Sequence, residues 1–115
     1  LDHTIYTDRR SFEFIIGQIV SNAIKYSGKD ARLHIWVDLR DGMTILTLKD
    51  NGQGVKACDL PYIFEKGFTG DSGETRKKST GIGLYLVKQL ADDLNIGVKA
   101  SSTWEQGFSI SLSFP

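Results

Sequence analysis

An acidic residue followed by two glycines marks the middle of the chain. Asp50 ends a run that reads as a strand, and the sequence continues Asn51-Gly52-Gln53-Gly54. Leu46, Leu48 and Asp50 share a parity, so the carboxylate should point to the same side as two apolar residues. The glycines lack side chains that would keep a ligand away from the backbone. The segment predicts either a ligand-binding turn built on a carboxylate or an ordinary glycine-rich turn.

Two other segments carry residue types that suit an anionic ligand. Ser79-Thr80-Gly81-Ile82-Gly83-Leu84 stands at the entrance to a predicted helix, where free amides and the helix dipole favour phosphate. A plain loop-to-helix turn would use the same residues. Gln18, Asn22 and Lys25 recur at i, i+4 and i+7, which lines an amide and a cation along one helix face. Such a stripe is also typical of a solvated helix face, so each segment alone leaves the function open.

Hydrophobic periodicity predicts the elements that hold these residues. Apolar residues recur at helical spacing over residues 8–27, with Asp8 as the N-cap. Alternating runs over 33–39 and 43–50 flank the pair Asp41-Gly42, a pattern that predicts a hairpin with a two-residue turn.

The second half of the chain predicts a long loop followed by more regular structure. Residues 51–83 are rich in glycine and poor in apolar residues, apart from a predicted helical turn over 60–64. Within this loop we expect residues 66–80 to exchange their amides faster than the first helix does. The whole order predicts a two-layer α/β sandwich, with a largely antiparallel sheet covered by helices on one face. The remaining elements are predicted over residues 84–94, 98–101 and 108–114.

Length and composition exclude several classes of protein. The 115 residues fit one domain, residues 1–115, and 14 Lys+Arg balance 14 Asp+Glu. The net charge of zero therefore gives no long-range electrostatic attraction for nucleic acid or anionic lipid. The single cysteine, Cys58, excludes an intrachain disulfide and a four-thiolate zinc site. Because no apolar run approaches the roughly 18 residues that span a bilayer, we expect a soluble piece, and the absence of an initial Met suggests a longer parent protein.

Four segments follow one another in a recognisable order. They read Gln18-Ile-Val-Ser-Asn22-Ala-Ile-Lys25-Tyr26, Asp50-Asn-Gly52-Gln-Gly54, Ile63-Phe64-Glu65-Lys66-Gly67-Phe68 and Thr80-Gly81-Ile-Gly83-Leu84. They resemble the asparagine box, first glycine box, phenylalanine box and second glycine box of the catalytic ATP-binding domain of bacterial sensor histidine kinases. This branch belongs to the superfamily of gyrase, Hsp90 and MutL. The resemblance covers nearly the whole chain and implies an α+β, Bergerat-type ATP-binding fold: a mixed, mostly antiparallel sheet covered on one face by about three helices, with an ATP lid over about 55–80.

The wording of residues 64–70 and 77–88 is most similar to the small intramembrane-sensing kinases. Members of this subfamily work beside peptide-antibiotic transporters and respond to cell-envelope stress. The resemblance implies a membrane-anchored bacterial parent with this domain in the cytoplasm, and a helical dimerisation domain that bears the phosphorylated histidine. A response regulator would be an indirect partner, an ABC transporter a partner of the full-length protein, and nucleic acid no partner. We expect the fragment itself to be monomeric.

The resemblance also implies a role for each matching residue. Asn22 would bind the Mg²⁺ that bridges the phosphates, and Lys25 would contact a phosphate oxygen. Asp50 would accept a hydrogen bond from the exocyclic amine of adenine, which guanine does not offer at that ring position. ATP and Mg²⁺ are therefore the implied cofactors, and no catalytic residue is assigned within the chain. The other implied nucleotide-binding residues are Tyr26, Gly52, Gly54, Val55, Lys77, Lys78, Thr80, Gly81, Ile82, Gly83 and Leu84.

Two positions depart from the family pattern. Gln18 stands where many sensor kinases have Asn and where gyrase and MutL have a Glu that activates water. Because glutamine is not a general base near neutral pH, we expect the fragment to bind ATP with little hydrolysis and no autophosphorylation. Glu105-Gln-Gly107-Phe108 keeps only the second glycine of the last glycine box and has Phe where Thr is usual, so we assign it no site role. The alternatives are a slow ATPase or a serine-directed kinase on the same fold, and a non-catalytic ATP-binding or docking module.

Overall fold

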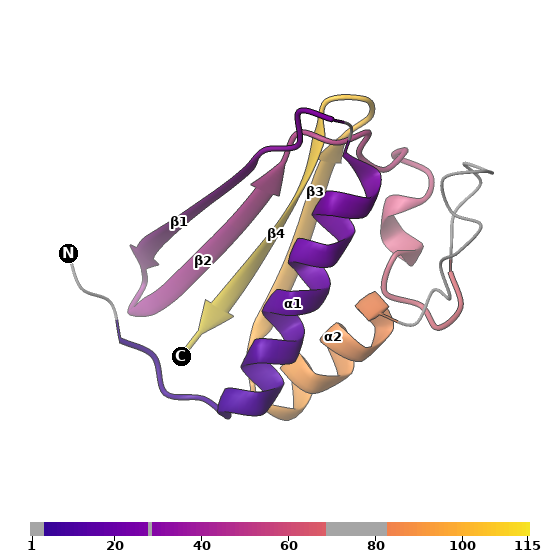
Figure 1. The fold of residues 1–115 in the computed structure, drawn as a ribbon. Coiled ribbons are helices and arrows are strands. Elements are labelled where there is room, and N and C mark those ends of the chain that lie inside the picture. Colours follow the sequence, from indigo (N-terminus) through magenta and orange to yellow (C-terminus); the bar gives the residue numbers. More distant parts are fainter. Residues whose placement is uncertain (1–3, 28, 69–82) are drawn as a thin grey trace.

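The computed structural model describes residues 4–27, 29–68 and 83–115, which form one sheet with helices on one of its faces (Figure 1). The predicted lid residues from 69 onward, and the predicted site residues between 77 and 82, lie outside the described part. The elements in chain order are α1 (Arg9–Tyr26), β1 (Leu33–Arg40), β2 (Met43–Asp50), the 3₁₀ turn η1 (Leu60–Tyr62), α2 (Gly83–Asp93), β3 (Gly97–Thr103) and β4 (Gly107–Phe114).

Helix α1 begins and packs as its sequence predicts. The Asp8 carboxylate accepts a hydrogen bond of 2.9 Å from the Ser11 backbone N–H, which satisfies one of the free amides of the first turn. This hydrogen bond lowers the pKa of Asp8. Ile15, Ile19 and Ala23 recur every four residues and are buried against the sheet. The predicted N-cap and the predicted helix are confirmed, with the helix ending at Tyr26.

The sheet has the strand order β1-β2-β4-β3, and its three pairings are all antiparallel. β1 and β2 are joined by Asp41 and Gly42, whose φ angles are 52° and 78°. A two-residue turn with both φ angles positive matches the twist of the flanking strands, and Asp-Gly tolerates it well. The predicted hairpin is therefore confirmed, including its turn.

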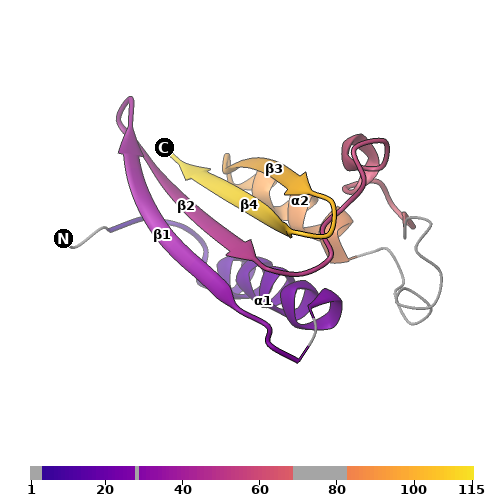
Figure 2. The same ribbon diagram turned by 90° about the horizontal axis from the view of Figure 1, so that it is seen from above.

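Strand register separates an apolar inner face from a polar outer face. On the inner face, Leu48 of β2 lies opposite Ile35 of β1 and Ile110 of β4. On the outer face, the hydroxyl groups of Thr47 and Ser111 are hydrogen-bonded at 3.0 Å. Seen from above, both helices cover the inner face only (Figure 2). The buried core consists of Ile15, Ile19, Leu48, Val87, Ala91, Ile96, Ile110, Leu112 and Phe114.

The second half of the chain refines the predicted boundaries. Helix α2 buries Val87 and Ala91 and is followed by Asn95, whose positive φ of 59° lets the chain turn out of the helix. β3 extends beyond its predicted end to Thr103, and η1 lies within the predicted helical turn. The α+β two-layer fold is confirmed. Within the described part, two α-helices rather than about three cover the sheet, since η1 is a single 3₁₀ turn, and all strand pairings are antiparallel rather than mixed. Within the same residues, no helix has both the length and the apolar composition that crossing a bilayer requires.

The β3–β4 turn contains a residue with a strained backbone conformation, and relieving this strain is expected to stabilise the fold. Glu105 adopts a φ of 67°, a left-handed conformation that costs a residue with a Cβ about 1–2 kcal/mol. Glycine adopts it freely but loses about 0.5–1 kcal/mol through its more flexible unfolded state. We expect Glu105→Gly to raise the free energy of unfolding by about 0.5–1 kcal/mol in urea denaturation. The neighbouring Gln106→Gly, at a position without positive φ, should lower it; equal effects of the two variants would contradict this account.

Candidate functional site

Asp50 is the buried carboxylate of the predicted site. It is the last residue of β2, on the inner face of the sheet, and only 9% of its surface is exposed. Its Oδ1 accepts a hydrogen bond of 2.8 Å from the Gly52 backbone N–H. Burial raises the pKa of Asp50, while hydrogen bonds from the Gly52 and Phe108 amides oppose this rise. An ionised carboxylate has about four acceptor positions, so two amides leave acceptor capacity for a further donor.

Three polar residues on α1 form a stripe that begins beside this carboxylate. Gln18 and Asn22 belong to the stripe predicted from sequence, and Tyr26 continues it at the same interval of four residues, next to the predicted third member, Lys25. With a rise of 1.5 Å per residue, the stripe extends about 12 Å along the helix axis. All three side chains are partly exposed, unlike the buried residues of the adjacent core-facing stripe.

The two ends of the stripe contact different parts of the predicted site. A Cβ on Gly52 would lie 2.7 Å from the Tyr26 carbonyl oxygen and 3.1 Å from Asp50 Oδ1. At the other end, Gln18 Oε1 lies against Gly83, the first residue of α2, so closely that a Cβ there would overlap it. The stripe therefore runs from a buried carboxylate to the N-terminus of a helix, where free amides and the helix dipole favour anions.

The glycine-rich loop after β2 is fixed to its surroundings on both sides. Asn51 Oδ1 accepts a hydrogen bond of 2.8 Å from the Arg32 N–H, and Asn51 Nδ2 donates one of 3.0 Å to the Asp30 carbonyl. Gly54 has a φ of 74°, and a Cβ there would lie 2.6 Å from the Thr103 carbonyl oxygen. Asn51 thus holds the loop to the chain before β1, a role that residue type and spacing do not predict.

A cavity of about 480 Å³ adjoins the C-terminal end of α1. Two buried polar atoms of residues that line this cavity, Ser27 Oγ and Gln53 Nε2, have no hydrogen-bond partner within the described part of the chain. The lining residues are Lys25, Tyr26, Ser27, Asn51, Gly52, Gln53 and Glu105.

The described residues bring together part of the predicted site. Tyr26, Asp50 and Gly52 lie in one group, and Asn22 is one helical turn from Tyr26 on the same face. Lys25 is exposed beside this group, and its Nζ lies 5.8 Å from the centre of the Tyr26 ring. Val55 and Leu84 are half-buried; Val55 is bonded to Ser102, and Leu84 packs against the hydrophobic core. The predicted residues Lys77, Lys78, Thr80, Gly81 and Ile82 lie outside the described part.

The oxygen donors of the candidate site suit a metal ion that is coordinated mainly by phosphate and water and only by one or two protein side chains. Among residues 4–27, 29–68 and 83–115, no three His, Cys, Asp or Glu side chains are grouped to hold a metal ion. Mg²⁺ does not require such a cage, because it keeps several waters and binds through one or two protein oxygens together with phosphate. The amide oxygen of Asn22 fits this type of coordination.

Comparison with known proteins identifies the class to which this fold and site belong. Residues 7–115 match the family described as histidine kinase-, DNA gyrase B-, and HSP90-like ATPase, and the chain belongs to this family.

Two curated relatives are bacterial sensor kinases. The chain is 45% identical over 114 residues to the sensor histidine kinase YxdK of Bacillus subtilis (strain 168), covering 98% of this chain and 35% of that protein. It is 40% identical over 115 residues to the sensor protein kinase GraS of Staphylococcus aureus (strain JH1), covering 100% of this chain and 33% of that protein. The chain thus spans about a third of the length of these relatives. The predicted relationship to sensor histidine kinases is confirmed.

Solved structures confirm the fold. The mycobacterial sensor histidine kinase MprB superposes with a TM-score of 0.86 at 21% identity, over 96% of this chain and 76% of that one. Full-length ShkA in complex with AMPPNP superposes with a TM-score of 0.80 at 22% identity, over 97% of this chain and 23% of that one.

Proposed function

We propose that this chain is the magnesium-dependent ATP-binding catalytic domain of a sensor histidine kinase, and that it donates the ATP γ-phosphoryl group to a histidine on a separate helical dimerisation domain. The observation that supports this most directly is the polar stripe of α1, which leads from the buried Asp50 to the N-terminus of α2. A nucleotide has the matching polarity, with a neutral base at one end and an anionic triphosphate at the other. The sensor histidine kinase relatives support the proposal that the phosphoryl group goes from ATP to a histidine.

In this proposal the buried end of the site recognises the base. Asp50 accepts a hydrogen bond from the exocyclic amine of adenine, and burial strengthens this bond because little water competes for the carboxylate. Gly52 and Gly54 let the loop pass close to the base, while Tyr26 and Val55 add apolar contact. Guanine carries a carbonyl at the equivalent position and has no proton to donate to Asp50, which makes the site selective for adenine.

The other end of the stripe holds the phosphates. Asn22, in the middle of the stripe, would provide a neutral oxygen for Mg²⁺. Lys25 lies beside Tyr26 at the Asp50 end, and its long side chain would provide a positive charge for a phosphate oxygen. The backbone amides that precede and begin α2, from Thr80, Gly81 and Ile82 to Gly83 and Leu84, receive the phosphates at the helix N-terminus, and Lys77 and Lys78 add positive charge. When bound, Mg²⁺-ATP supplies the phosphoryl group and partly neutralises its charge. The chain's own residues position it, while the nucleophile belongs to the other domain.

Gln18 supports transfer rather than hydrolysis. Its side-chain oxygen lies against Gly83 at the phosphate end of the stripe. An amide at this point does not accept a proton from water near neutral pH, so it does not generate a nucleophilic hydroxide. Steady ATP turnover by the chain is therefore expected to be very slow.

The proposal also assigns partners to the whole protein. The chain spans about a third of its sensor-kinase relatives, so the histidine-bearing dimerisation domain belongs to the remaining part of a membrane-anchored bacterial kinase. A response regulator receives the phosphoryl group from that histidine, and a peptide-antibiotic ABC transporter is the expected partner in sensing envelope stress.

A calorimetric titration of the 115-residue chain tests the proposal. With Mg²⁺ present we expect saturable binding of ATP, at least about tenfold weaker binding of GTP, and weaker ATP binding when EDTA removes the metal. Addition of the histidine-bearing domain of a relative, with radiolabelled ATP, should label that domain and not this chain. The absence of ATP binding by a folded chain would favour a docking module, and rapid phosphate release without the second domain would favour an ATPase.

A further inference from the structure

The glycine-rich loop of the proposed site rests on the turn between β3 and β4. The Gln53 carbonyl accepts a backbone hydrogen bond from the Glu105 N–H. A Cβ on Gly54 would lie 2.6 Å from the Thr103 carbonyl, 2.7 Å from Ser102 Oγ and 2.8 Å from the Gly107 carbonyl. The loop therefore contacts the β3–β4 turn closely at the successive residues Gln53 and Gly54, and these contacts fix the position of the loop.

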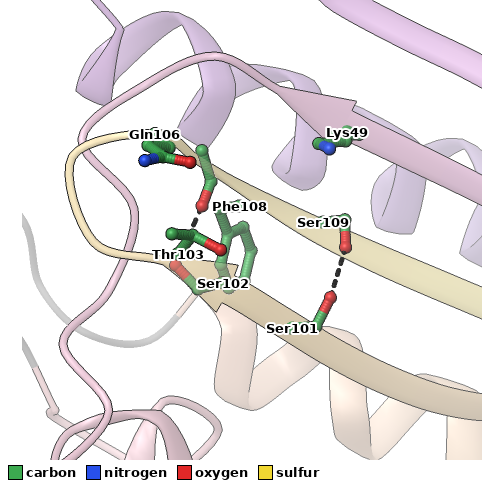
Figure 3. A pocket seen from close by; sticks show the side chains of 8 residues that line it. Lys49, Ser101, Ser102, Thr103, Gln106, Phe108 and Ser109 are labelled. Carbon is green, nitrogen blue, oxygen red and sulfur yellow. Dashed lines mark hydrogen bonds between the residues drawn. The ribbon is translucent and has the colours of Figure 1, made fainter.

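One side chain links the loop and the turn through two hydrogen bonds. The Val55 backbone N–H donates to Ser102 Oγ over 2.6 Å, and the Ser102 hydroxyl donates to the Gly107 carbonyl over 2.9 Å. The hydroxyl thus accepts and donates at the same time, which alanine cannot do. Figure 3 shows Ser102 and Phe108 next to each other at this end of the sheet, beside a cavity of about 200 Å³.

Strand register connects this hydroxyl to the buried carboxylate. Asp50 of β2 lies opposite Phe108 of β4, which lies opposite Ser102 of β3, so the three residues form one row on the inner face. The loop starts at one end of this row, beside Asp50, and is anchored at the other end through Val55. The row spans two strand spacings, about 10 Å.

We infer that Ser102 is a positioning residue of the nucleotide site: its hydroxyl fixes Val55, and thereby holds Gly52 and Gly54 at the distance from Asp50 that a base requires. This inference rests on the proposed function. Ser102 does not touch the nucleotide; it acts through the loop. A loop held in place before binding does not have to be ordered by the ligand, so its anchor contributes to affinity.

The experiment compares three variants in ATP titrations with Mg²⁺. Ser102→Ala removes both hydrogen bonds and is expected to weaken ATP binding about 5- to 10-fold. Ser102→Thr keeps the hydroxyl in a residue suited to a strand and should bind within about twofold of the unmodified chain. Ser101→Ala is the matched control, because Ser101 Oγ is bonded to Ser109 Oγ at 2.7 Å on the outer face and does not contact the loop (Figure 3).

Site-resolved amide exchange distinguishes positioning from general stability. In Ser102→Ala the Val55 amide should exchange at least about tenfold faster, while the core amides of Leu48 and Ile110 keep their rates. Absence of ATP binding by the unmodified chain would overturn the proposed function. If the unmodified chain binds ATP, two results would overturn this inference alone. One is that Ser102→Ala changes neither the ATP affinity nor the exchange rate of the Val55 amide. The other is that Ser101→Ala loses as much ATP affinity as Ser102→Ala does. If Ser102→Ala does not fold, rapid Val55 exchange in the folded unmodified chain would overturn it.

Discussion

Asp50→Asn is expected to lower the affinity for ATP about 10- to 100-fold and to leave the folded chain at least as stable as before. A hydrogen bond to a charged acceptor contributes about 1.5–3 kcal/mol, and the new amide presents a donor where the adenine amine also donates. Stability should not fall, because burial raises the pKa of Asp50 and thus penalises its charged form, which asparagine lacks.

The pH dependence of stability tests the same residue without nucleotide. Because burial raises the folded-state pKa of Asp50 above its ordinary value of 3.8, the folded chain binds this proton more tightly than the unfolded chain does. The resulting stabilisation is fully present below pH 3.8 and is lost as the pH rises through the folded-state pKa. Relative to Asp50→Asn, the unmodified chain should therefore gain free energy of unfolding on acidification through this window.

Asp38→Asn is the matched control for both measurements. Asp38 also lies on a strand, but it points to the outer face, opposite Ile45 of β2 and away from the site. Its substitution should leave ATP affinity unchanged. Unaltered ATP binding by Asp50→Asn, or a large loss in Asp38→Asn, would contradict the role of Asp50 as the adenine acceptor.

Gly54→Ala is expected to have the largest effect on stability. Its φ of 74° is unfavourable for alanine, and the added Cβ would lie within 2.6–2.8 Å of three oxygen atoms, two of them backbone carbonyls. We expect a loss of about 3 kcal/mol in the free energy of unfolding, from left-handed strain together with the displacement of the loop. For a chain of this size that corresponds to a melting temperature lower by about 10–15 °C. ATP affinity, measured at a temperature where the variant is folded, should fall as well.

Gly42→Ala separates the backbone strain of a positive φ from the steric contacts of the added Cβ. Gly42 has a similar φ of 78°, but a Cβ there would meet nothing within 4 Å. Its substitution should therefore cost only about 1 kcal/mol and leave ATP affinity unchanged. Thermal and urea denaturation of both variants make the comparison. Equal losses would mean that the contacts of Gly54 with the β3–β4 turn contribute little.

Much of the fold could be predicted from local sequence. The four-residue spacing of Ile15, Ile19 and Ala23 identifies α1, and Asp8 marks its start, because capping depends on residues within one turn. Asp41-Gly42 identifies the β1–β2 hairpin, since its two positive φ angles are required by the turn itself.

The core of the candidate site was also accessible from sequence. Asp50, Gly52 and Gly54 lie in one continuous segment, and the Asn22–Tyr26 part of the stripe lies in one helix. Residue types and spacing within a single element suffice to place such groups together. The resemblance to sensor kinases added the expectation that these segments form one nucleotide site, and the family match confirms the family.

The sequence by itself thus determined most of the elements, the inward direction of Asp50 and the shared helix face of Gln18 and Asn22, because spacing within one helix or strand decides which residues share a face. Only the tertiary structure decided that Ser102 anchors Val55, 47 positions earlier in the chain. Ser101, Ser102 and Thr103 are alike in composition, and their roles differ because the register of β3 against β4 turns Ser102 alone of the three toward the inner face. That register is set by the apolar pairs of the whole sheet, because a slip of one residue would expose the core, and no local pattern around Ser102 encodes it.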